Sequence, residues 1–495
     1  MIWVLVAACA VASVPAGLRW LRVAQREHYL APSTTRFAIR WWSAGPLNLT
    51  LAVIAVAGVV GSLWHPMIGL LVVAAQVGPL GLTLKGTTSP LAWTPRLRRL
   101  GWGAGALVAL VYLLGALAGS ALTVTLGLFA LPALVDLALT ILGPIERRIG
   151  DQWVEQAAAR LRSSGARVVA ITGSYGKTTT KGYAAHLLAG TKRVVASPAS
   201  FNNRLGLARA VNEQLVPGTE VFIAEMGTYG PGEIAALCQW IQPEVAAIVA
   251  IGPVHLERFR SEDRIVAAKS EILDRARIGV IAVDNPLLAN LANQRRGELE
   301  LITVGAEMER VTIQDGSLLV DGAVVGQVPG SVMAIDLCVA VGICIALGVE
   351  AAAIAPRLED LPRPEHRLTL EESGSGVRII DDTYNSNPAG ANAALDRLAE
   401  VANAGRTAVV TPGMVELGSR QDSENEGFAR RAADEVDYLL IVGSTNRKSL
   451  LRGSANGSAS VTVVATRDDA VTWVRENLAE GDTVLYENDL PDHYP

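Results

Sequence analysis

Residues 171–180 read ITGSYGKTTT and connect an apolar run, which begins at Arg167, to a segment with a helical pattern. Glycines let backbone N–H groups close around phosphate oxygens, and the N-terminus of a helix favours negative charge. Lys177 is long enough to bridge the β- and γ-phosphates of a nucleotide, and the Thr178 hydroxyl can ligate Mg²⁺. The stretch therefore predicts a nucleotide-binding loop made of Gly173, Ser174, Tyr175, Gly176, Lys177, Thr178 and Thr179.

The glycine spacing of this loop is shorter than that of the usual P-loop, because only two residues separate its glycines. An ordinary glycine-rich turn is the alternative, but it does not account for the coincidence of strand, glycines, Lys-Thr pair and helix. Glu225 ends a second apolar run, 221–225, where a magnesium ligand belongs if the strand lies beside a phosphate loop in a parallel sheet. Taken alone, this carboxylate would be a weak signal.

Short Val/Ile/Ala-rich runs alternate with helical stretches after residue 150, which predicts an α/β fold with parallel strands covered on both faces. A turn-rich β region is expected at 311–328, and a helix near 334–347 should end at a glycine. Pro362 and Pro364 then indicate a linker. The predicted domains are 151–361, with strands at 167–172, 221–225, 245–251 and 279–283, and 362–495, with strands at 377–380, 407–410, 438–442 and 461–464.

The composition of the 495 residues excludes a disordered or nucleic-acid-coating chain and points to membrane spans. Half of the residues are hydrophobic, 18% are charged and the mean hydropathy is +0.31. Residues 1–150 carry 11 Lys/Arg against 3 Asp/Glu, whereas residues 151–495 carry 32 against 45. The four cysteines lack the spacing of a metal site, so we expect core or lipid-facing thiols. No nucleic-acid partner is expected.

Five apolar runs in residues 1–150 each approach the roughly 20 residues that a helix needs to cross a bilayer. We therefore expect an all-α membrane domain of about five helices in this region. The first run has no basic residues before it, and Arg19, Arg22 and Arg26 follow it, so it is predicted to be a retained helix rather than a signal peptide. The runs are 2–18, 47–63, 67–84, 102–120 and 122–142.

The basic residues predict the orientation of these helices. Lys and Arg occur after the first, third and fifth runs, whereas the connections after the second and fourth runs carry none. The positive-inside rule then predicts a multi-pass protein of the inner membrane, with its N-terminus outside and its catalytic domains in the cytoplasm. Asp136 is the one acid within an apolar run, and we expect it to pair with another helix or to lie near the interface, rather than to serve a relay or a lipid head group.

Further short motifs follow the glycine loop in an order that is typical of one enzyme family. Together they resemble the Mur ligase family, most closely its MurF-type members, which join D-Ala-D-Ala to a muramyl peptide. The resemblance covers about residues 165–445 and implies a P-loop central domain followed by a Rossmann-like C-terminal domain. The matching motifs are 201–203 (FNN), 225–227 (EMG), 231–234 (PGEI), 251–252 (IG), 255–257 (HLE), 268–272 (AKSEI), 366–368 (HRL), 381–388 (DDTYNSNP) and 414–418 (MVELG).

The resemblance implies an amide ligase that uses ATP and two Mg²⁺ ions. ATP phosphorylates a substrate carboxylate, which is a poor electrophile by itself, and an amine then attacks the acyl phosphate. Lys177, Thr178 and Glu225 fit the phosphate clamp and the first metal. In the family, the lysine equivalent to Lys269 is carbamylated by CO₂ and ligates the second metal, and His255 corresponds to the magnesium-site histidine. Without the resemblance, these two residues would be interpreted as a solvated helix lysine and a structural histidine.

The resemblance also implies a site that the two soluble domains share. Arg367 follows the linker and is similar to the family arginine that reaches the phosphates of ATP from the C-terminal domain. Asp382, Tyr384 and Asn385 resemble a loop that closes over the nucleotide, although on sequence alone this segment indicates only a turn. Closure of the domains would complete the catalytic centre and exclude water from the acyl phosphate.

The chain departs from the family where substrates are recognised. Apolar runs stand in place of the soluble domain that holds the UDP-sugar, Asn425 stands near a usual histidine, and residues 486–491 (YENDLP) replace a Lys-Gly-Ser-Arg-like segment. We therefore expect the reaction class to be kept and the substrates to differ. The predicted partners are membrane lipid, a carboxylate envelope precursor, free or lipid-linked, and an amine such as an amino acid or a dipeptide. A poly-γ-glutamate-type synthase and a catalytically silent ATP-binding scaffold are the alternatives.

Overall fold

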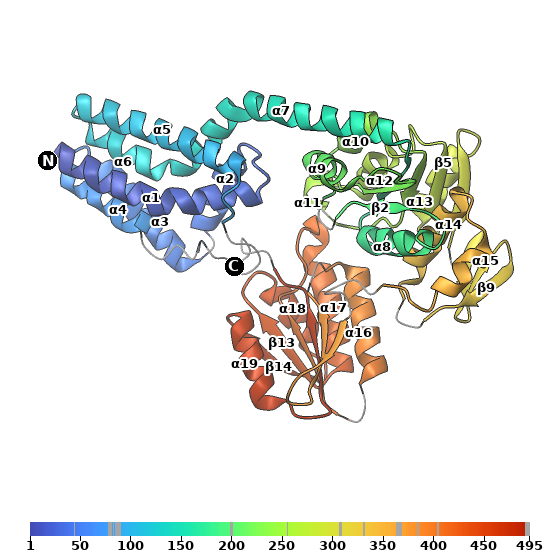
Figure 1. The fold of residues 1–495 in the computed structure, drawn as a ribbon. Helices are drawn as coiled ribbons and strands as arrows, with labels where there is room; N and C mark the ends of the chain where they lie inside the picture. Colours follow the sequence, from blue (N-terminus) through green and yellow to red (C-terminus); the bar gives the residue numbers. More distant parts are fainter. Residues whose placement is uncertain are drawn as a thin grey trace. The chain divides into compact units, whose positions relative to one another are not determined.

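The structure is a computed structural model, and Figure 1 shows it as a ribbon. It describes residues 1–490 except 44, 78–81, 83, 85–90, 199–200, 255, 306–308, 330–331, 363–368, 384–385 and 403–404. The described chain forms two compact units, Met1–Gly150 and Asp151–Leu490. The first unit is helical, and the second contains two sheets.

The first unit packs its helices around one apolar core. The helices are α1 Ile2–Arg26, α2 Ser33–Trp42, α3 Pro46–Gly61, η1 Pro66–Gly69, α4 Leu70–Val77, α5 Pro95–Leu117, α6 Ala121–Phe129 and α7 Leu131–Ser164, the last of which continues into the second unit. Trp20 of α1 is fully buried and meets the Phe37 ring of α2 edge-on, with ring centroids 6.4 Å apart. A Cβ added at Gly61 would lie 2.4 Å from the Ile68 side chain. Small residues therefore let neighbouring helices approach closely.

Two of these helices, α1 and α5, are long and apolar enough to cross a membrane. The number rises to four if each of two bent pairs, α2 with α3 and α6 with α7, counts as one span. The sequence predicted five spans, which is more than either of these two counts. The apolar run 122–142 forms two helices that bend by 74°, and the described part of the run 67–84 forms only η1 and the short α4. An apolar run indicates that a segment is buried or lies in a membrane, but it does not determine how long or how straight its helix is.

Asp136 of α7 pairs with another helix, which is one of the two arrangements expected for it. Its carboxylate is buried and accepts hydrogen bonds from the backbone N–H groups of Thr34 (3.2 Å) and Thr35 (2.7 Å) and from the Thr35 hydroxyl (2.5 Å). These donors lie in the first turn of α2, where unpaired N–H groups and the helix dipole favour an anion. The acid therefore fastens α2 to α7.

The second unit begins with a nine-stranded sheet in the order β2-β3-β1-β4-β5-β6-β7-β8-β9. Its strands are β1 Arg167–Thr172, β2 Val194–Ala196, β3 Val221–Glu225, β4 Val245–Ile248, β5 Ile278–Ala282, β6 Glu300–Val304, β7 Val311–Gln314, β8 Ser317–Val320 and β9 Ala323–Gln327. Neighbouring strands are parallel as far as β7, and β7, β8 and β9 form antiparallel hairpins. The two Asp-Gly pairs at 315–316 and 321–322 have positive φ, which confirms the hairpin turns predicted from them.

Helices cover both faces of this sheet, as the continuous apolar strands predicted. α8 and α14 pack over one face, which includes Ile171 and Val280, whereas the other face packs against α9, α10, α12, α13 and the end of α7. α14 ends before Gly348, whose φ of 77° is the expected glycine stop. The helices are α8 Lys177–Leu188, α9 Arg204–Gln214, α10 Glu233–Ile241, α11 Leu256–Phe259, α12 Glu262–Ser270, α13 Pro286–Arg295, α14 Ala334–Ala346, α15 Ala351–Ile354 and η2 Ala355–Arg357.

The second sheet of this unit has six strands in the order β10-β11-β15-β12-β13-β14. β10 is antiparallel to β11, and the other pairs are parallel. The four strands expected here correspond to β11–β14, whereas the central strand β15 was not predicted. The elements are β10 Thr369–Glu372, β11 Arg378–Asp382, α16 Pro388–Val401, β12 Thr407–Thr411, η3 Gly418–Arg420, α17 Gln421–Glu435, β13 Tyr438–Val442, α18 Arg447–Ser454, β14 Ser460–Val464, α19 Arg467–Asn477 and β15 Thr483–Glu487.

Candidate active site

The predicted phosphate-binding loop lies between β1 and α8, at the carboxyl edge of the parallel sheet. Gly176 precedes α8 at a φ of 80°, and a Cβ there would lie 2.3 Å from a carboxylate oxygen of Asp336. A Cβ at Gly173 would lie 2.9 Å from the Tyr175 carbonyl oxygen. Both positions therefore require glycine, and the loop wraps tightly at the positive end of α8, where anions are favoured.

Lys177 begins α8, and its side chain lies over the loop. Its ammonium donates hydrogen bonds to the carbonyl oxygens of Gly173 (2.8 Å) and Ser174 (3.3 Å). The Ser174 hydroxyl in turn donates to the Gly252 carbonyl oxygen (3.2 Å) and accepts from the Gly252 N–H (3.1 Å). The loop is thus fixed on both sides, with a cation held where the phosphates of a nucleotide would bind.

Glu225 ends β3 and lies opposite Ile171 in the neighbouring strand β1. Its buried carboxylate accepts hydrogen bonds from the Thr178 hydroxyl (3.0 Å) and from the Lys181 ammonium (2.8 Å). Burial opposes its ionisation, but the charge and the hydrogen bond of Lys181 outweigh burial and lower the pKa of Glu225 below its usual value. The structure therefore brings together Thr178 and Glu225, the ligands predicted for the first magnesium ion, and keeps the carboxylate ionised.

Lys181 is a member of this site that the sequence analysis missed. It lies one turn after Lys177 on α8, and its side chain is only 7% exposed. Two lysines four residues apart share one face of a helix, so the spacing was a visible signal. Asn202, in the 201–203 motif, also reaches this site, because its side-chain amide lies 3.5 Å from the Glu225 carboxylate.

Lys269 lies in the last turn of α12 and is buried, with 5% of its surface exposed. Its ammonium donates to the Gly173 carbonyl oxygen over 2.9 Å, so it reaches the same loop carbonyl as Lys177. Burial, and then the charge of Lys177, hold the pKa of Lys269 well below its ordinary value. The side chain is therefore part of the loop environment and does not extend into solvent.

These side chains line a pocket of about 170 Å³ beside the loop. Sites for drug-sized ligands hold about 300–1,000 Å³, so the volume suits a phosphate chain rather than a whole nucleotide. The base and ribose of a nucleotide would then lie outside this pocket. The predicted residues that line it are Gly173, Ser174, Tyr175, Gly176, Lys177, Thr178, Glu225 and Lys269, and Asn202 and Asn387 are among the others.

The remaining predicted site residues differ in what the structure shows of them. Thr179 is buried, and its hydroxyl has no hydrogen-bond partner among the described residues. Asp382 ends β11, is buried, and lies opposite Glu487 of β15 in the register of the two strands. The residues whose roles stay predictions because they lie outside the described residues are His255, Arg367, Tyr384 and Asn385.

The donor set of the pocket fits Mg²⁺ that binds together with a nucleotide. Thr178 and Glu225 supply oxygen ligands, which Mg²⁺ prefers, and substrate phosphates and water usually complete its coordination. Within the part of the chain that the structure describes, no group of three or more His, Cys, Asp or Glu side chains could hold a metal ion. The site therefore does not resemble a cage in which the protein supplies every ligand.

Two family models match the second unit of the chain. They are the Mur ligase middle domain, over residues 171–331, and the Mur ligase, glutamate ligase domain, over residues 366–486. The chain is also 30% identical over 373 residues to the UDP-N-acetylmuramoyl-tripeptide--D-alanyl-D-alanine ligase of Mycobacterium leprae, a match that covers 66% of this chain and 72% of that relative. The chain belongs to the Mur ligase family.

Other relatives and solved structures agree with this assignment. This Mur ligase is 28% identical over 348 residues to the UDP-N-acetylmuramoyl-tripeptide--D-alanyl-D-alanine ligase of Bacillus subtilis. The match covers 67% of this chain and 75% of that relative. MurF from Acinetobacter baumannii matches at 24% identity and a TM-score of 0.60, covering 68% of this chain and 77% of that one. MurF ligase from Thermotoga maritima, solved with ADP, matches at 24% identity and a TM-score of 0.58, covering 69% and 80%. These structures confirm the predicted Mur-ligase-type fold.

Family membership also confirms the expected enzyme class. This Mur ligase is an ATP-dependent enzyme that forms C–N bonds, so the alternative of a catalytically silent scaffold is set aside. The glycine loop, Glu225 and Lys269 all lie within the matched middle domain. Neither family model includes residues 1–150, so the helical unit is an addition that the matched family models do not describe.

Proposed function

We propose that this Mur ligase forms a peptide-type amide bond in peptidoglycan synthesis at the inner face of the cytoplasmic membrane. The relatives support the pathway, because their names specify ligation of D-alanyl-D-alanine to a UDP-N-acetylmuramoyl-tripeptide. ATP phosphorylates a substrate carboxylate, and the amine of an amino acid or a dipeptide then displaces the phosphate. The observation that carries the proposal is the meeting of Lys177, Lys269 and Glu225 around one glycine loop.

Phosphoryl transfer requires positive charge around the transferred group, and the loop supplies it. Lys177 provides a cation, and the backbone N–H groups at the start of α8 add the positive end of a helix dipole. Thr178 and Glu225 would hold Mg²⁺, which neutralises charge on the β- and γ-phosphates when it is bound. Lys181 keeps the Glu225 carboxylate ionised and therefore able to bind a cation.

Lys269 is proposed to be carbamylated in the active enzyme and to hold a second Mg²⁺. An ammonium repels a metal ion, whereas a neutral amine can add CO₂, lose a proton and become a carbamate anion. Burial and the charge of Lys177 favour the neutral amine of Lys269 and so support this modification. His255 is the proposed partner ligand of this ion. Arg367 is proposed to reach the phosphates from the C-terminal domain, and Asp382, Tyr384 and Asn385 to close over the nucleotide.

The helical unit is proposed to be a multi-pass membrane domain. It would leave the central domain, 151–361, and the C-terminal domain, 362–495, in the cytoplasm. Large apolar side chains such as Val11 (74% exposed) and Leu117 (72% exposed) lie on the surface of this unit, and a bilayer would cover them. The basic residues that follow alternate apolar runs support an orientation with the first helix starting outside. This orientation needs an odd number of crossings, so the segment with η1 and the short α4 is proposed to cross as well, in addition to the four spans that the helices supply when each bent pair counts as one.

The carboxylate substrate is proposed to be an envelope precursor that is either free or lipid-linked. The helical unit supports this choice. It occupies the part of the chain where relatives of this family are expected to have a UDP-sugar domain, and neither family model matches it. A growing γ-linked glutamate peptide is the second candidate. The description of the second matched model, a glutamate ligase domain, favours that candidate.

Nucleotide turnover by the purified full-length protein tests this function. A muramyl tripeptide with D-alanyl-D-alanine is compared with a γ-glutamyl peptide and glutamate, and ADP release is measured together with the amide product by mass spectrometry. ADP release that requires both the acid and the amine is the expected result. Lys177→Ala should abolish it while leaving membrane fractionation unchanged, and near-normal amide formation by Lys177→Ala would refute the assigned phosphate clamp. Precursors that accumulate in a strain carrying this variant would identify the carboxylate.

A further inference from the structure

The helical unit contains a groove of about 500 Å³ between α1, α5 and α7. Its lining is almost entirely apolar, and it includes the small residues Gly17 of α1 and Gly101, Gly105 and Ala109 of α5. A Cβ added at Gly17 or at Gly105 would meet no atom of the described residues within 4 Å. Both glycines therefore face space that the described side chains do not fill.

The groove is long and narrow. Its lining follows α5 from Arg98 to Tyr112, which corresponds to about 21 Å at 1.5 Å per residue. A helix of about 10 Å diameter and that length would occupy on the order of 1,600 Å³, which is much more than the groove holds. A single hydrocarbon chain is far thinner and fits this shape, so a peptide helix is not the occupant that the dimensions favour.

One end of the groove carries a cation. Arg98 lines the groove, and no side-chain hydrogen bond or ion pair links it to any other residue in the described part of the chain. Its neighbours on α5 are engaged elsewhere. Arg99 donates two hydrogen bonds, 2.5 and 2.8 Å long, to the Glu146 carboxylate, and the Arg96 guanidinium stacks 4.2 Å from the Tyr29 ring centroid. Of these three arginines, Arg98 is therefore the one whose charge is available to a molecule in the groove.

The two hydroxyl groups that line the groove already have partners. The hydroxyls of Ser13 and Tyr112 hydrogen-bond to each other over 2.7 Å, and the Ser13 hydroxyl donates to the Cys9 carbonyl oxygen over 2.8 Å. Trp93 and Trp102, which are close to Arg98 in sequence, also line the groove and are 52% and 83% exposed. Exposed tryptophans are typical of the boundary between a bilayer and water. The groove therefore suits a molecule that is apolar along its length and anionic at one end.

We propose that this groove binds one hydrocarbon chain of a phosphate-bearing membrane lipid, with the phosphate at Arg98. The proposal rests on the membrane location proposed above for the helical unit, but not on the ligase reaction. The planar guanidinium matches phosphate oxygens in geometry as well as in charge. The orientation proposed from the basic residues puts the start of α5 on the cytoplasmic side, so the head group would belong to the inner leaflet.

Native mass spectrometry of the full-length protein released from detergent tests this site. The probes are phosphatidylglycerol, which is anionic, phosphatidylcholine with the same chains, which is net neutral, and inorganic phosphate. Arg98→Ala removes the cation, and Gly105→Leu places a side chain in the open groove. Arg147→Ala removes an exposed arginine outside the groove, and Ala106→Leu enlarges an exposed α5 residue that does not line it, so these two are the matched controls.

Phosphatidylglycerol should be retained in preference to phosphatidylcholine, and inorganic phosphate should not displace it. Arg98→Ala should reduce retention of phosphatidylglycerol about fivefold, which is the effect of one basic residue near an anionic surface. Gly105→Leu should reduce retention of both lipids, because both place a chain in the groove. Arg147→Ala and Ala106→Leu should bind like the wild type.

Two results would overturn the proposal. Equal losses in Arg98→Ala and Arg147→Ala would indicate general surface charge, and unchanged binding in Gly105→Leu would place the lipid elsewhere. If thermal unfolding shows that Gly105→Leu is misfolded, Gly17→Leu replaces it, because a leucine there fills the groove from α1. Flotation of the wild type with vesicles is measured in parallel, so that failure of the membrane location is distinguished from failure of the groove.

Discussion

Lys269 shows how the surroundings of one residue set a chemical requirement for the whole enzyme. Its amine is buried against the glycine loop and is biased toward the neutral form that CO₂ modifies. If the carbamate forms, removal of CO₂ should lower amide formation by about tenfold or more, in the range measured when metal sites are weakened, and added bicarbonate should restore it. Lys269→Arg places a permanent cation there and cannot form the carbamate, so bicarbonate should not rescue it. Activity that is indifferent to CO₂ would contradict the modification.

Glu487 is a second buried ionisable residue, and it lies in the segment that departs from the family pattern. It ends β15, is fully buried, and accepts hydrogen bonds from the hydroxyls of Ser386 and Thr411. Burial raises the pKa of Glu487 to about 7; the two hydroxyl bonds oppose this shift, and the charge of Asp382 adds to it. In the folded protein this carboxyl is therefore protonated over a wider pH range than a carboxyl in water, up to about pH 7.

The raised pKa of Glu487 predicts a pH dependence of stability. Because the folded-state pKa lies above the ordinary value of 4.5, the folded protein binds more protons than the unfolded chain between these values. The protonated Glu487 carboxyl therefore stabilises the fold fully at pH values below 4.5, by up to ~3 kcal/mol. This stabilisation is lost as pH rises through about 7. Glu487→Gln should thus be more stable than the wild type near pH 8 and no more stable near pH 5. Urea unfolding of the full-length protein at both pH values, followed by circular dichroism, checks this, and an equal difference at both pH values would refute it.

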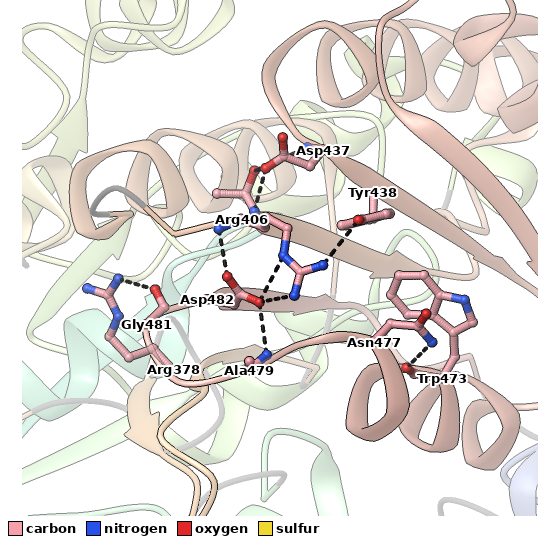
Figure 2. Close-up of polar contacts among 10 residues, drawn as sticks. Arg378, Arg406, Asp437, Tyr438, Trp473, Asn477, Ala479, Gly481 and Asp482 are labelled. Carbon is pink, nitrogen blue, oxygen red and sulfur yellow. Dashed lines mark hydrogen bonds and ion pairs between the residues drawn. The ribbon is translucent and has the colours of Figure 1, made fainter.

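At the scale of elements, one buried carboxylate ties together the loops before β12 and β15, as Figure 2 shows. Asp482 accepts hydrogen bonds from the Arg406 backbone N–H (2.8 Å), the Arg406 guanidinium (2.7 Å) and the Ala479 N–H (2.9 Å). The same guanidinium also donates to the Tyr438 hydroxyl of β13 over 3.3 Å. Three strands are therefore joined at their amino ends through residues that lie far apart in sequence.

Asp482→Ala should destabilise the C-terminal domain by about 1 kcal/mol, because it removes the buried acceptor of the Arg406 and Ala479 N–H groups, which are themselves near the surface. Burial by itself would raise the pKa of Asp482, but the Ala479 N–H and Arg406 outweigh it and lower that pKa. The contribution is therefore present above the ordinary aspartate pKa and is lost as pH falls below it. Asp437→Ala, at an exposed carboxylate that binds Thr407 at the same edge, is the control. Urea unfolding that shows equal losses in the two variants would contradict the prediction.

The elements that could be predicted are those whose pattern is local. β1, β3 and β5 are continuous apolar runs between turn residues, so their sequence alone indicates buried parallel strands. β15 was missed because it has polar residues at both ends and its central place between β11 and β12 depends on partners more than 70 positions earlier in the chain. The spacing of Lys181 from Lys177 indicates a shared helix face, but its partner Glu225 lies 44 residues away, so the ion pair itself is not visible in the sequence. Chemistry that depends on one loop is visible in sequence, whereas ion pairs between elements are not.

At the scale of the whole molecule, the helical unit and the ligase unit differ in how much of their structure the sequence predicts. The glycine loop and its helix could be predicted together with their chemistry, because each residue type there has one physical purpose. The apolar runs of residues 1–150 predicted helices but overstated the number of spans, because the described part of the run 67–84 forms only η1 and the short α4. The proposed orientation of the helical unit therefore rests on where its Lys and Arg residues lie along the chain, and it can be measured directly.

Labelling of single cysteines in whole cells tests the proposed orientation. The four native cysteines are all buried, so they should contribute little background. Trp64→Cys lies at a 74% exposed position after α3 and should react with a membrane-impermeant maleimide in intact cells, because the connection there carries no Lys or Arg. Ser163→Cys, exposed at the end of α7, should react only after permeabilisation. The reverse pattern would invert the orientation, and protection of both positions until lysis would show that residues 1–150 do not expose this connection outside the cell.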